Sequence, residues 1–357
     1  MNTKLIFTNN VADTLEKYVA ENNFSDIFVH VDVNTAKFVM PILESQSETI
    51  RKAHKITSPA GDDNKNIEQL TGLWKQLSDA QATRSALFIN LGGGMVSDLG
   101  GLAAATFKRG LTVVNVPTTL LSAVDASVGG KTGINFNGFK NHVGLFYCPD
   151  VVIISTVFFQ TLTNYDMLSG YAEMIKHAML KGKQCFDKVM AYDVTLPPVN
   201  PDALIGLIKE SVLIKKDVVD ADPHESGLRK VLNYGHTIGH ALESLAVNDR
   251  KSTLAHGFAV AQGLVVETVL SNMLKGFDSA ELHKLATYVK NSYGPYDITC
   301  DDYPKLLEYM RQDKKNIDSG NIDFVLLSDF GKPEINVTVS EKDICVALDI
   351  YRDLMGI

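Results

Sequence analysis

Paired cysteines, long apolar runs and an excess of positive charge are all missing from this sequence, and each deficit excludes a class of protein. The four cysteines stand far apart and form no CxxC pair, so neither a disulfide framework nor a thiolate zinc site is predicted. No apolar run approaches the ~20 residues of a membrane-spanning helix, and residues 1–10 hold no apolar core of signal-peptide length. We expect a cytoplasmic protein.

The formal net charge of −8 disfavours a general nucleic-acid-binding role, because phosphate backbones are bound by basic surfaces. Any anionic ligand must therefore meet a local cluster of positive side chains. With 45% hydrophobic and 21% charged residues and a mean hydropathy of +0.01, the composition is that of a soluble, folded chain. Its 357 residues exceed the usual size of one hydrophobic core, so we expect two domains.

The first part of the chain alternates short β-rich apolar runs with helical stretches. This alternation predicts an α/β domain over residues 1–162, with a mostly parallel sheet covered by helices on both faces. Dinucleotide binding is a common function of such a domain. The runs that predict strands are Ile27–Val31, Ala86–Asn90, Thr112–Val116 and Val151–Ser155.

Beyond residue 162 the apolar residues follow helical periodicity, and we expect a mainly α-helical domain over residues 163–357. A short β-like pair near Ile322–Leu327 and Glu334–Val337 is the exception. The predicted helices are Leu168–Lys181, Pro201–Val219, Lys230–Leu245, Gly257–Leu274, Ser279–Asn291 and Tyr303–Gln312.

A glycine-rich segment, LGGGMVSDLGG at residues 91–101, follows the second predicted strand. A strand, a glycine turn and a helix start form the setting in which backbone N–H groups hold a pyrophosphate. The strict GxGxxG fingerprint fails, because Ser97 stands at the third glycine. The alternative is a tight turn in which glycine supplies a positive φ.

Two further features bear on nucleotide binding. Asp32 closes the first predicted strand, where a carboxylate suits a ribose hydroxyl, although a helix-capping aspartate fits the position equally well. The run GGKT at residues 129–132 suggests a P-loop, but Asp125 stands where the first glycine of GxxxxGK[ST] belongs. A P-loop phosphotransferase is therefore disfavoured.

Arg229, Asn233, His236 and His240 are spaced by four, three and four residues, so on one helix they would form a continuous polar stripe. That spacing normally carries a core-facing row of Leu and Val. A single histidine on a helix is usually structural, but four polar side chains in place of an apolar row indicate a functional face. The segment is not HExxH, which excludes that metalloprotease motif, yet either histidine could face a metal.

Glu173 and Lys176 fall on one face of the predicted helix Leu168–Lys181, and His256 precedes the start of another. A surface Glu–Lys pair is the simplest interpretation of the first two. Two histidines and a carboxylate from three elements, His236, His256 and Glu173, also match a catalytic zinc-type site with open positions. Spacing alone does not bring the three together in space.

Taken in chain order, these segments resemble the 3-dehydroquinate synthase family of sugar-phosphate cyclases. The matching blocks run in the family's order between about residues 59 and 332, so the resemblance covers most of the chain. They are GGGMVSDLGG, FKRG, VPTTLLSAVDASVGGKTGIN, GFKNHVGLFYCP, GYAEMIKHAML, LRKVLNYGHTIGHALE, AHGFAVAQG and RQDKKN.

The resemblance implies two cofactors, one divalent metal and a tightly bound NAD. The metal, zinc or cobalt, would be bound by Glu173, His236 and His256, ligands that do not decide between the two ions. The implied NAD contacts are Asp32, Asn34, Lys65, Gly93, Gly94, Asp98, Thr118, Thr119, Asp125, Lys131, Lys140, Phe158 and Thr161.

The resemblance also implies a sugar-phosphate substrate and a homodimer in which Arg109 is lent across the interface. We expect His240 to relay a proton and Lys176 and Lys216 to steady oxyanions. The implied substrate-site residues are Asp125, Lys131, Asn141, Lys176, Lys216, Arg229, Asn233, His240 and one lysine of Lys314-Lys315.

The family reaction converts 3-deoxy-D-arabino-heptulosonate 7-phosphate to 3-dehydroquinate and phosphate, in the shikimate pathway of aromatic amino acid biosynthesis. C5 is oxidised transiently by NAD, phosphate is eliminated, the ketone is reduced, and ring opening and an aldol closure complete the carbocycle. Arg229, with Asn233 and His240, suits the substrate carboxylate, which sedoheptulose 7-phosphate and glucose 6-phosphate lack. A polyol dehydrogenase, the other alternative, would release NADH and need fewer phosphate-binding lysines.

Two positions depart from the family pattern. Residues 61–65 read GDDNK where family members usually carry Gly-Glu before the lysine, so the acid on the adenosine side is shorter. Ser97 replaces a glycine. Both changes concern the geometry of NAD binding, and neither concerns the reacting carbons.

Overall fold

The computed structural model describes residues 3–137, 139–195, 201–312 and 322–357. Backbone contacts divide the chain into two compact units, Met1–Gly170 with Thr195–Lys216 and Tyr171–Val194 with Asp217–Ile357. The sequence predicts one boundary after residue 162, whereas residues 163–170 and 195–216 group with the first unit. The reason is that helices α7 (Asn164–Lys181) and α9 (Pro201–Ala221) each start in the first unit and end in the second.

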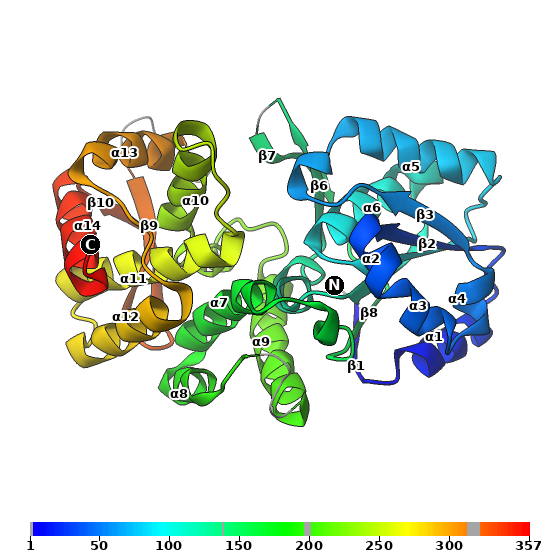
Figure 1. Ribbon diagram of the computed structural model, residues 1–357, viewed down its shortest axis with the longest axis horizontal. Helices are drawn as coiled ribbons and strands as arrows, with labels where there is room; N and C mark the ends of the chain where they lie inside the picture. The colour runs from blue at the N-terminus through cyan, green and yellow to red at the C-terminus, as the bar shows by residue number, and fades with distance from the viewer. Residues whose placement is uncertain (1–2, 138, 196–200, 313–321) are drawn as a thin grey trace. The chain divides into compact units, whose positions relative to one another are not determined.

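Six strands in the described part of the first unit form its main sheet, and each neighbouring pair is parallel (Figure 1). This confirms the predicted α/β class with a mostly parallel sheet. The prediction missed the two edge strands, which are short and only partly buried. Across the sheet the order is β1 (Lys4–Phe7), β8 (Val151–Ile154), β5 (Thr112–Pro117), β4 (Leu87–Gly92), β2 (Ile27–Asp32) and β3 (His54–Ser58).

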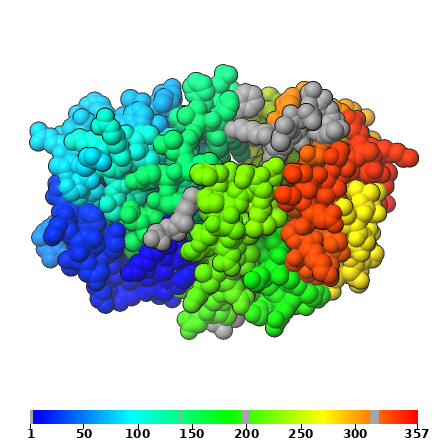
Figure 2. Space-filling view, turned by 180° about the vertical axis from the view of Figure 1, so that it is seen from behind, coloured from blue at the N-terminus to red at the C-terminus, as the bar shows by residue number. Residues whose placement is uncertain are grey.

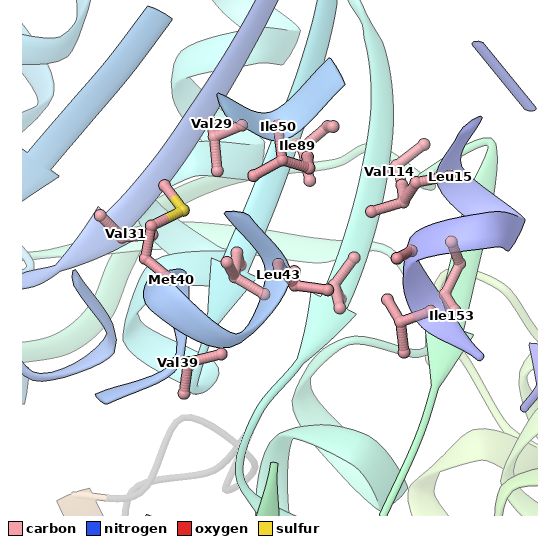
Figure 3. Close-up of a cluster of buried hydrophobic side chains, with 14 of the residues drawn as sticks. Leu15, Val29, Val31, Val39, Met40, Leu43, Ile50, Ile89, Val114 and Ile153 are labelled. Atoms are coloured by element: carbon pink, nitrogen blue, oxygen red, sulfur yellow. The ribbon is translucent and has the colours of Figure 1, made fainter. Parts of the chain in front are cut away.

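The sheet buries apolar side chains on both faces, because successive residues of a strand point to opposite sides. Helices α1 (Val11–Ala20), α3 (Met40–Glu44) and α4 (Glu48–Lys52) cover one face, and α5 (Ile67–Asp79) and α6 (Gly94–Thr106) cover the other. The first face packs Leu15, Leu43 and Ile50 against Val29, Ile89, Val114 and Ile153 (Figure 3). The second packs Leu73 and Leu99 against Phe28, Phe88 and Val113.

Besides the start of α7 and most of α9, the other described elements of the first unit are a short helix, a hairpin and four short turns. The hairpin strands β6 (Lys131–Phe136) and β7 (Phe139–Phe146) are antiparallel and form a separate ribbon that packs on α6. The short helix is α2 (Val33–Phe38), and the turns are η1 (Asp62–Asn64), η2 (Phe107–Arg109), η3 (Ser122–Ala126) and η4 (Phe159–Thr161).

The described part of the second unit is mainly helical, as predicted, with one antiparallel pair of strands. β9 (Ile322–Asp329) and β10 (Lys332–Val339) confirm the β-like pair near Ile322–Leu327 and Glu334–Val337. In the space-filling view the orange to red segment that includes α14 lies beside the yellow α12 (Figure 2). Besides α7, the described helices are α8 (Lys183–Ala191), α10 (His236–Ser244), α11 (His256–Lys275), α12 (Ser279–Tyr293), α13 (Tyr303–Gln312) and α14 (Glu341–Met355).

The predicted helix Lys230–Leu245 is wrong in its first part. Residues Leu228–Asn233 form a 3-10 helix, η5, and Gly235 then adopts a left-handed conformation with φ 81° before α10 begins. A residue with positive φ interrupts the right-handed helix, so Arg229 and Asn233 do not share a helix with His236 and His240. The four side chains therefore form no single helical stripe.

Helix α11 is long and apolar enough to cross a membrane by length and composition alone, with a mean hydropathy of 1.3 over its most apolar window. However, 78% of that window is buried inside the protein. The helix packs against α10, α12, α14 and β9, so its place in the core of the second unit accounts for its apolar composition.

Candidate metal centre and nucleotide-binding edge

The structure brings Glu173, His236 and His256 together from three helices of the second unit. Glu173 lies on α7, and the two histidines are the first residues of α10 and α11. One ligand atom from each residue lies within 4.8 Å of the others. The Nε2 atoms of His236 and His256 lie 3.4 and 3.3 Å from Oε1 of Glu173. Sequence spacing could not join these elements, and the fold does.

These separations fit a shared metal ion. Two ligand atoms bound tetrahedrally to zinc at 2.0–2.2 Å stand about 3.4 Å apart. The side chain of Glu173 is fully buried; its Oε2 forms an ion pair with the ammonium of Lys176, and its Oε1 faces the two imidazoles. A buried carboxylate faced by two imidazole nitrogens at this spacing is a donor set suited to zinc or cobalt.

A second layer of contacts orients both imidazoles. Nδ1 of His236 lies 3.1 Å from the carbonyl oxygen of Tyr234, and Nδ1 of His256 lies 3.5 Å from Oε2 of Glu243. Each contact leaves the opposite ring nitrogen, Nε2, towards Glu173. Such outer contacts select the tautomer and fix the direction of a metal-binding histidine.

At Glu173 and His256, burial and the neighbouring charges shift the pKa in opposite directions. Burial favours a neutral Glu173, but the ammonium of Lys176, which forms an ion pair with Oε2, and His236 hold the pKa of the carboxyl well below its usual range. Burial, together with Lys176, lowers the pKa of His236 to about 3. Burial also opposes a charge on His256, yet the carboxylates of Glu173 and Glu243 raise its pKa to about 10. A divalent cation binding here would displace the proton of His256.

His240 lies one turn beyond His236 on α10, beside the same cluster. The ring centroid of His240 is 5.4 Å from that of His236 and 6.1 Å from that of His256. With Glu243 and His256 it forms a second group whose ligand atoms lie within 4.8 Å of one another. His240 is thus near the candidate metal centre without belonging to the Glu173 set.

Arg229 and Asn233 are held by a loop that precedes them. The carboxylate of Asp222 accepts hydrogen bonds from the backbone N–H groups of Gly227 and Arg229 at 2.7 and 3.0 Å, and these bonds lower the pKa of Asp222. The guanidinium of Arg229 donates to the carbonyl of Pro223 at 2.7 Å. Asn233 donates to Oε1 of Glu225 at 3.0 Å. These contacts orient both side chains from η5.

The lysines of α9 and of the pair Lys314-Lys315 are the next candidates for the substrate site. Lys215, which the sequence analysis did not select, is buried and donates to Oδ1 of Asp125 at 2.5 Å. Lys216, which it did select, is half-buried. The assignment of Lys314 or Lys315 falls outside the described residues.

The residues assigned to NAD gather at one edge of the sheet in the first unit. In a parallel sheet the carboxyl ends of all strands meet at the same edge, where nucleotides bind. Asp32 closes β2, Gly93 and Gly94 follow β4, and Thr118 and Thr119 follow β5. Phe158 and Thr161 follow β8, and the Thr161 hydroxyl donates to the carbonyl of Phe158 at 2.7 Å.

The glycines after β4 serve close packing rather than positive φ. Gly93 has φ −76°, and none of the glycines at residues 92–94 is in the left-handed region. A Cβ added at Gly93 would lie 3.4 Å from Cγ2 of Thr119, and one at Gly94 would lie 3.1 Å from Cβ of Ala126. The hydroxyl of Ser97 donates to the carbonyl of Gly94 at 3.0 Å, so the departure from the family pattern is accommodated within α6.

Two acids of this edge have explicit partners. Oδ1 of Asp32 accepts from the backbone N–H groups of Asn34 and Thr35 at 2.8 Å each, which confirms the capping interpretation. Nζ of the buried Lys65 lies 3.1 Å from Oδ2 of Asp98 and 3.0 Å from Oδ1 of Asp62. Burial raises the pKa of Asp98, against the effect of Lys65. Asp62, one of the two aspartates that stand where the family usually carries a glutamate, thus forms an ion pair with Lys65.

The remaining assigned residues of the first unit are exposed. Lys131 opens β6 and Lys140 lies in β7, with its Nζ 4.0 Å from Oδ2 of Asp62. The backbone N–H of Asn141 donates to Oδ1 of Asn135 at 2.9 Å. Arg109 ends the turn η2 with φ 69°.

A row of buried polar side chains, which the sequence analysis missed, crosses the sheet beneath α6. His30, Asn90 and Asn115 are direct neighbours in register across β2, β4 and β5. The polar row consists of Ser58, His30, Asn90 and Asn115, linked by contacts of 2.9, 3.2 and 2.9 Å. Burial lowers the pKa of His30 to about 4. In β2, β4 and β5 this polar residue stands between two apolar neighbours, and the pattern could have predicted the row from the sequence.

Solved structures share this fold. The 2-epi-5-epi-valiolone synthase of Streptomyces hygroscopicus subsp. jinggangensis 5008, with NAD+ and Zn2+ bound, superposes with a TM-score of 0.87 at 21% identity, covering 99% of this chain and 97% of that one. A 2-deoxy-scyllo-inosose synthase complexed with carbaglucose-6-phosphate, NAD+ and Co2+ gives 0.84 at 23% identity, covering 96% and 95%. At these identities the likeness establishes the fold.

Sequence comparison identifies the family. Models described as 3-dehydroquinate synthase N-terminal and C-terminal match residues 55–169 and 170–316. A 3-dehydroquinate synthase of Parabacteroides distasonis is 43% identical over 354 residues, which cover 99% of each chain. The two matched segments are consecutive, and the relative spans the full length. This chain therefore belongs to the 3-dehydroquinate synthase family.

Proposed function

We propose that this chain converts 3-deoxy-D-arabino-heptulosonate 7-phosphate to 3-dehydroquinate and phosphate, using NAD and one divalent metal, zinc or cobalt. The observation that carries the proposal is the spacing of His236 and His256 around the buried carboxylate of Glu173 in a member of this family. Bound there, the metal would supply Lewis acidity to the C4 and C5 oxygens, and NAD would supply a reversible hydride acceptor.

The first unit would bind NAD along the carboxyl edge of its sheet. The N–H groups at the start of α6, Gly94 onward, suit the pyrophosphate, because they carry the positive end of the helix dipole. Both capping bonds of Asp32 use Oδ1, so we assign Oδ2 to a ribose hydroxyl. Lys65 and Asp98, which form an ion pair, would lie beside the bound NAD.

The chain's own positive and amide groups would hold the two anionic ends of the substrate. We assign Lys131, Asn141 and one lysine of Lys314-Lys315 to the phosphate, and Arg229 to the carboxylate, whose two oxygens match a planar guanidinium. Lys176, buried beside Glu173, would steady an oxyanion formed at the reacting carbons. A local cationic cluster would thus serve an acidic protein.

Proton movement would depend on one residue of α10. The departing phosphate can take the proton next to the ketone itself, so elimination requires positioning more than an added base. We assign His240 to relay the proton of the C5 hydroxyl or of ring opening. His240→Asn should retain metal but lower kcat and alter the pH profile; an unchanged kcat and profile would remove this role.

Substrate choice is tested with three sugar phosphates, the heptulosonate, sedoheptulose 7-phosphate and glucose 6-phosphate. Each is supplied with NAD and zinc, while released phosphate and the carbocyclic product are measured. We expect turnover of the heptulosonate, and we expect Arg229→Met to raise its KM more than it changes kcat. Phosphate release from another of the three, and none from the heptulosonate, would reject the assignment.

The homodimer belongs to the same proposal. If Arg109 completes the site of a partner, Arg109→Ala and Glu173→Gln each inactivate the homodimer by removing different parts of a site. A mixed dimer would then contain one site with both residues intact. Subunit exchange between the two variants should restore activity, and sedimentation should give twice the mass of one chain.

A further inference from the structure

A buried carboxylate outside the candidate ligand set connects the two helices that carry the histidines. Glu267 lies in α11, the helix that begins with His256, and is fully buried. Its Oε2 accepts a hydrogen bond from the backbone N–H of Gly235 at 2.7 Å. Its Oε1 accepts one from the backbone N–H of Ile238 at 3.2 Å. Both partners belong to the turn that carries His236.

This contact replaces a helix cap. The N-cap position of α10 is Gly235, which has no side chain to accept the first N–H groups of the helix. In a capping box, two side chains of one segment serve the N–H groups of the N-cap and N3 residues. Here those groups belong to Gly235 and Ile238, and the single carboxylate of Glu267 serves both from a neighbouring helix. A negative charge also suits the positive end of the helix dipole.

Other contacts keep this turn close to α11. A Cβ added at Gly263 would lie 2.0 Å from the carbonyl oxygen of Gly235, so the two backbones touch there. The hydroxyl of Tyr234 lies 2.6 Å from Oγ1 of Thr268, the residue after Glu267. The carbonyl of Tyr234 in turn faces Nδ1 of His236. The position of His236 is therefore set by α11 as well as by its own helix.

We infer that Glu267 is a positioning residue of the metal centre: it holds His236 in register with His256, so that one preformed pair of imidazoles meets Glu173. The inference rests on the proposed function, because it assumes that this set binds the metal. Glu267 does not belong to the candidate ligand set. Its effect is on how tightly and in what geometry the metal is held.

The test measures metal affinity in the full-length protein. Native protein and Glu267→Gln are freed of metal, and Zn2+ binding is measured by competition with a chromogenic chelator. We expect Glu267→Gln to weaken Zn2+ binding by about 10- to 100-fold, the usual effect of losing an outer-layer contact. The ligand-field spectrum of the Co2+-loaded variant should also shift, which a loss of stability alone would not cause.

Tyr351→Phe is the matched control. Tyr351 is buried in α14, and its hydroxyl lies 2.9 Å from Oε1 of Gln262 in α11, so this change also removes a buried polar contact of α11 but not one made by Glu267. It should lower the melting temperature and leave Zn2+ affinity and the Co2+ spectrum native. If Glu267→Gln does not fold, Glu267→Asp, which keeps the charge and shortens its reach, should weaken Zn2+ binding in the same direction.

The outcomes separate the inference from the function. Native affinity and a native Co2+ spectrum in the Glu267 variants, with the native protein binding one ion, would overturn the positioning role and leave the proposed function standing. If the native protein itself binds no Zn2+, the metal centre fails and the inference fails with it.

Discussion

The ammonium nitrogen of Lys215 lies 2.5 Å from Oδ1 of Asp125 and 2.7 Å from the carbonyl oxygen of the same residue. Successive residues of an α-helix point about 100° apart, so the side chain of Lys216 leaves α9 in a different direction from that of Lys215. The resemblance to the family implies Lys216 as the substrate-site lysine. We propose Lys215 for that role instead, because Lys215 is the lysine that pairs with Asp125.

Replacing each of these two lysines by methionine gives a matched pair of variants. Lys215→Met should remove an ion-pair partner of the partly exposed carboxylate of Asp125 and lower the free energy of unfolding by roughly 1–3 kcal/mol, the cost of taking one partner from a hydrogen-bonded pair. It should also lower kcat/KM far more than Lys216→Met does. Denaturant unfolding and steady-state kinetics of both variants measure these changes. Equal losses of kcat/KM in the two variants would contradict the assignment to Lys215.

Removing the carboxylate charge of the metal set should abolish metal binding. Glu173→Gln keeps the shape of the side chain, but it removes the charge that faces His236 and His256. We expect the zinc content of the purified variant to fall from one per chain to near zero, and activity to fall more than about a hundredfold, beyond what outer-layer changes cause. Full zinc content in Glu173→Gln would mean that the ion binds elsewhere.

The buried His30 makes stability depend on pH. Its folded pKa of about 4 lies below the ordinary value of 6.5, so between these values the unfolded chain binds a proton that the folded chain does not. The contribution of His30 to the free energy of unfolding is therefore fully present above pH 6.5. It falls as the pH drops towards 4, by roughly 3 kcal/mol at most. Urea unfolding of His30→Asn, which cannot titrate, should show a smaller loss over that range; identical slopes would contradict the effect.

The polar row also requires a glycine above it. A Cβ at Gly100 of α6 would lie 1.9 Å from Oδ1 of Asn90 and 2.5 Å from Nδ1 of His30, so Gly100→Ala should destabilise the protein by about 1–3 kcal/mol through overpacking. Gly72 in α5 has nothing within 4 Å of an added Cβ. Gly72→Ala should therefore be neutral or stabilise by up to about 1 kcal/mol. Thermal unfolding of both variants distinguishes the two environments.

Periodic patterns in the sequence predicted the elements that bury a regular face. The four central strands and helices such as Tyr303–Gln312 follow this rule, because strong apolar alternation or i,i+3/i+4 spacing survives without tertiary context. Helix α14 was missed although Ser340 caps it, accepting from the N–H of Asp343 at 3.1 Å, and although Ile344, Leu348 and Tyr351 repeat at helical spacing. The cap and the apolar spacing together could have predicted this helix from the sequence.

Other features depend on contacts that no local pattern contains. The break at Gly235 was missed because the glycine lies in a segment of otherwise helical spacing, and the carboxylate that caps the new helix is Glu267, about thirty residues further along the chain. The meeting of Glu173 with His236 and His256 is likewise tertiary. The family resemblance suggested that set, and the fold supplied its geometry.

The central claim is a metal-dependent elimination in which NAD is restored. Protein freed of metal by a chelator should release no phosphate from 3-deoxy-D-arabino-heptulosonate 7-phosphate. Titration with Zn2+ should restore release up to one ion per chain, with 3-dehydroquinate formed in equal amount and no lasting absorbance of NADH. Phosphate release that ignores the chelator, or NADH that accumulates with each turnover, would contradict the account.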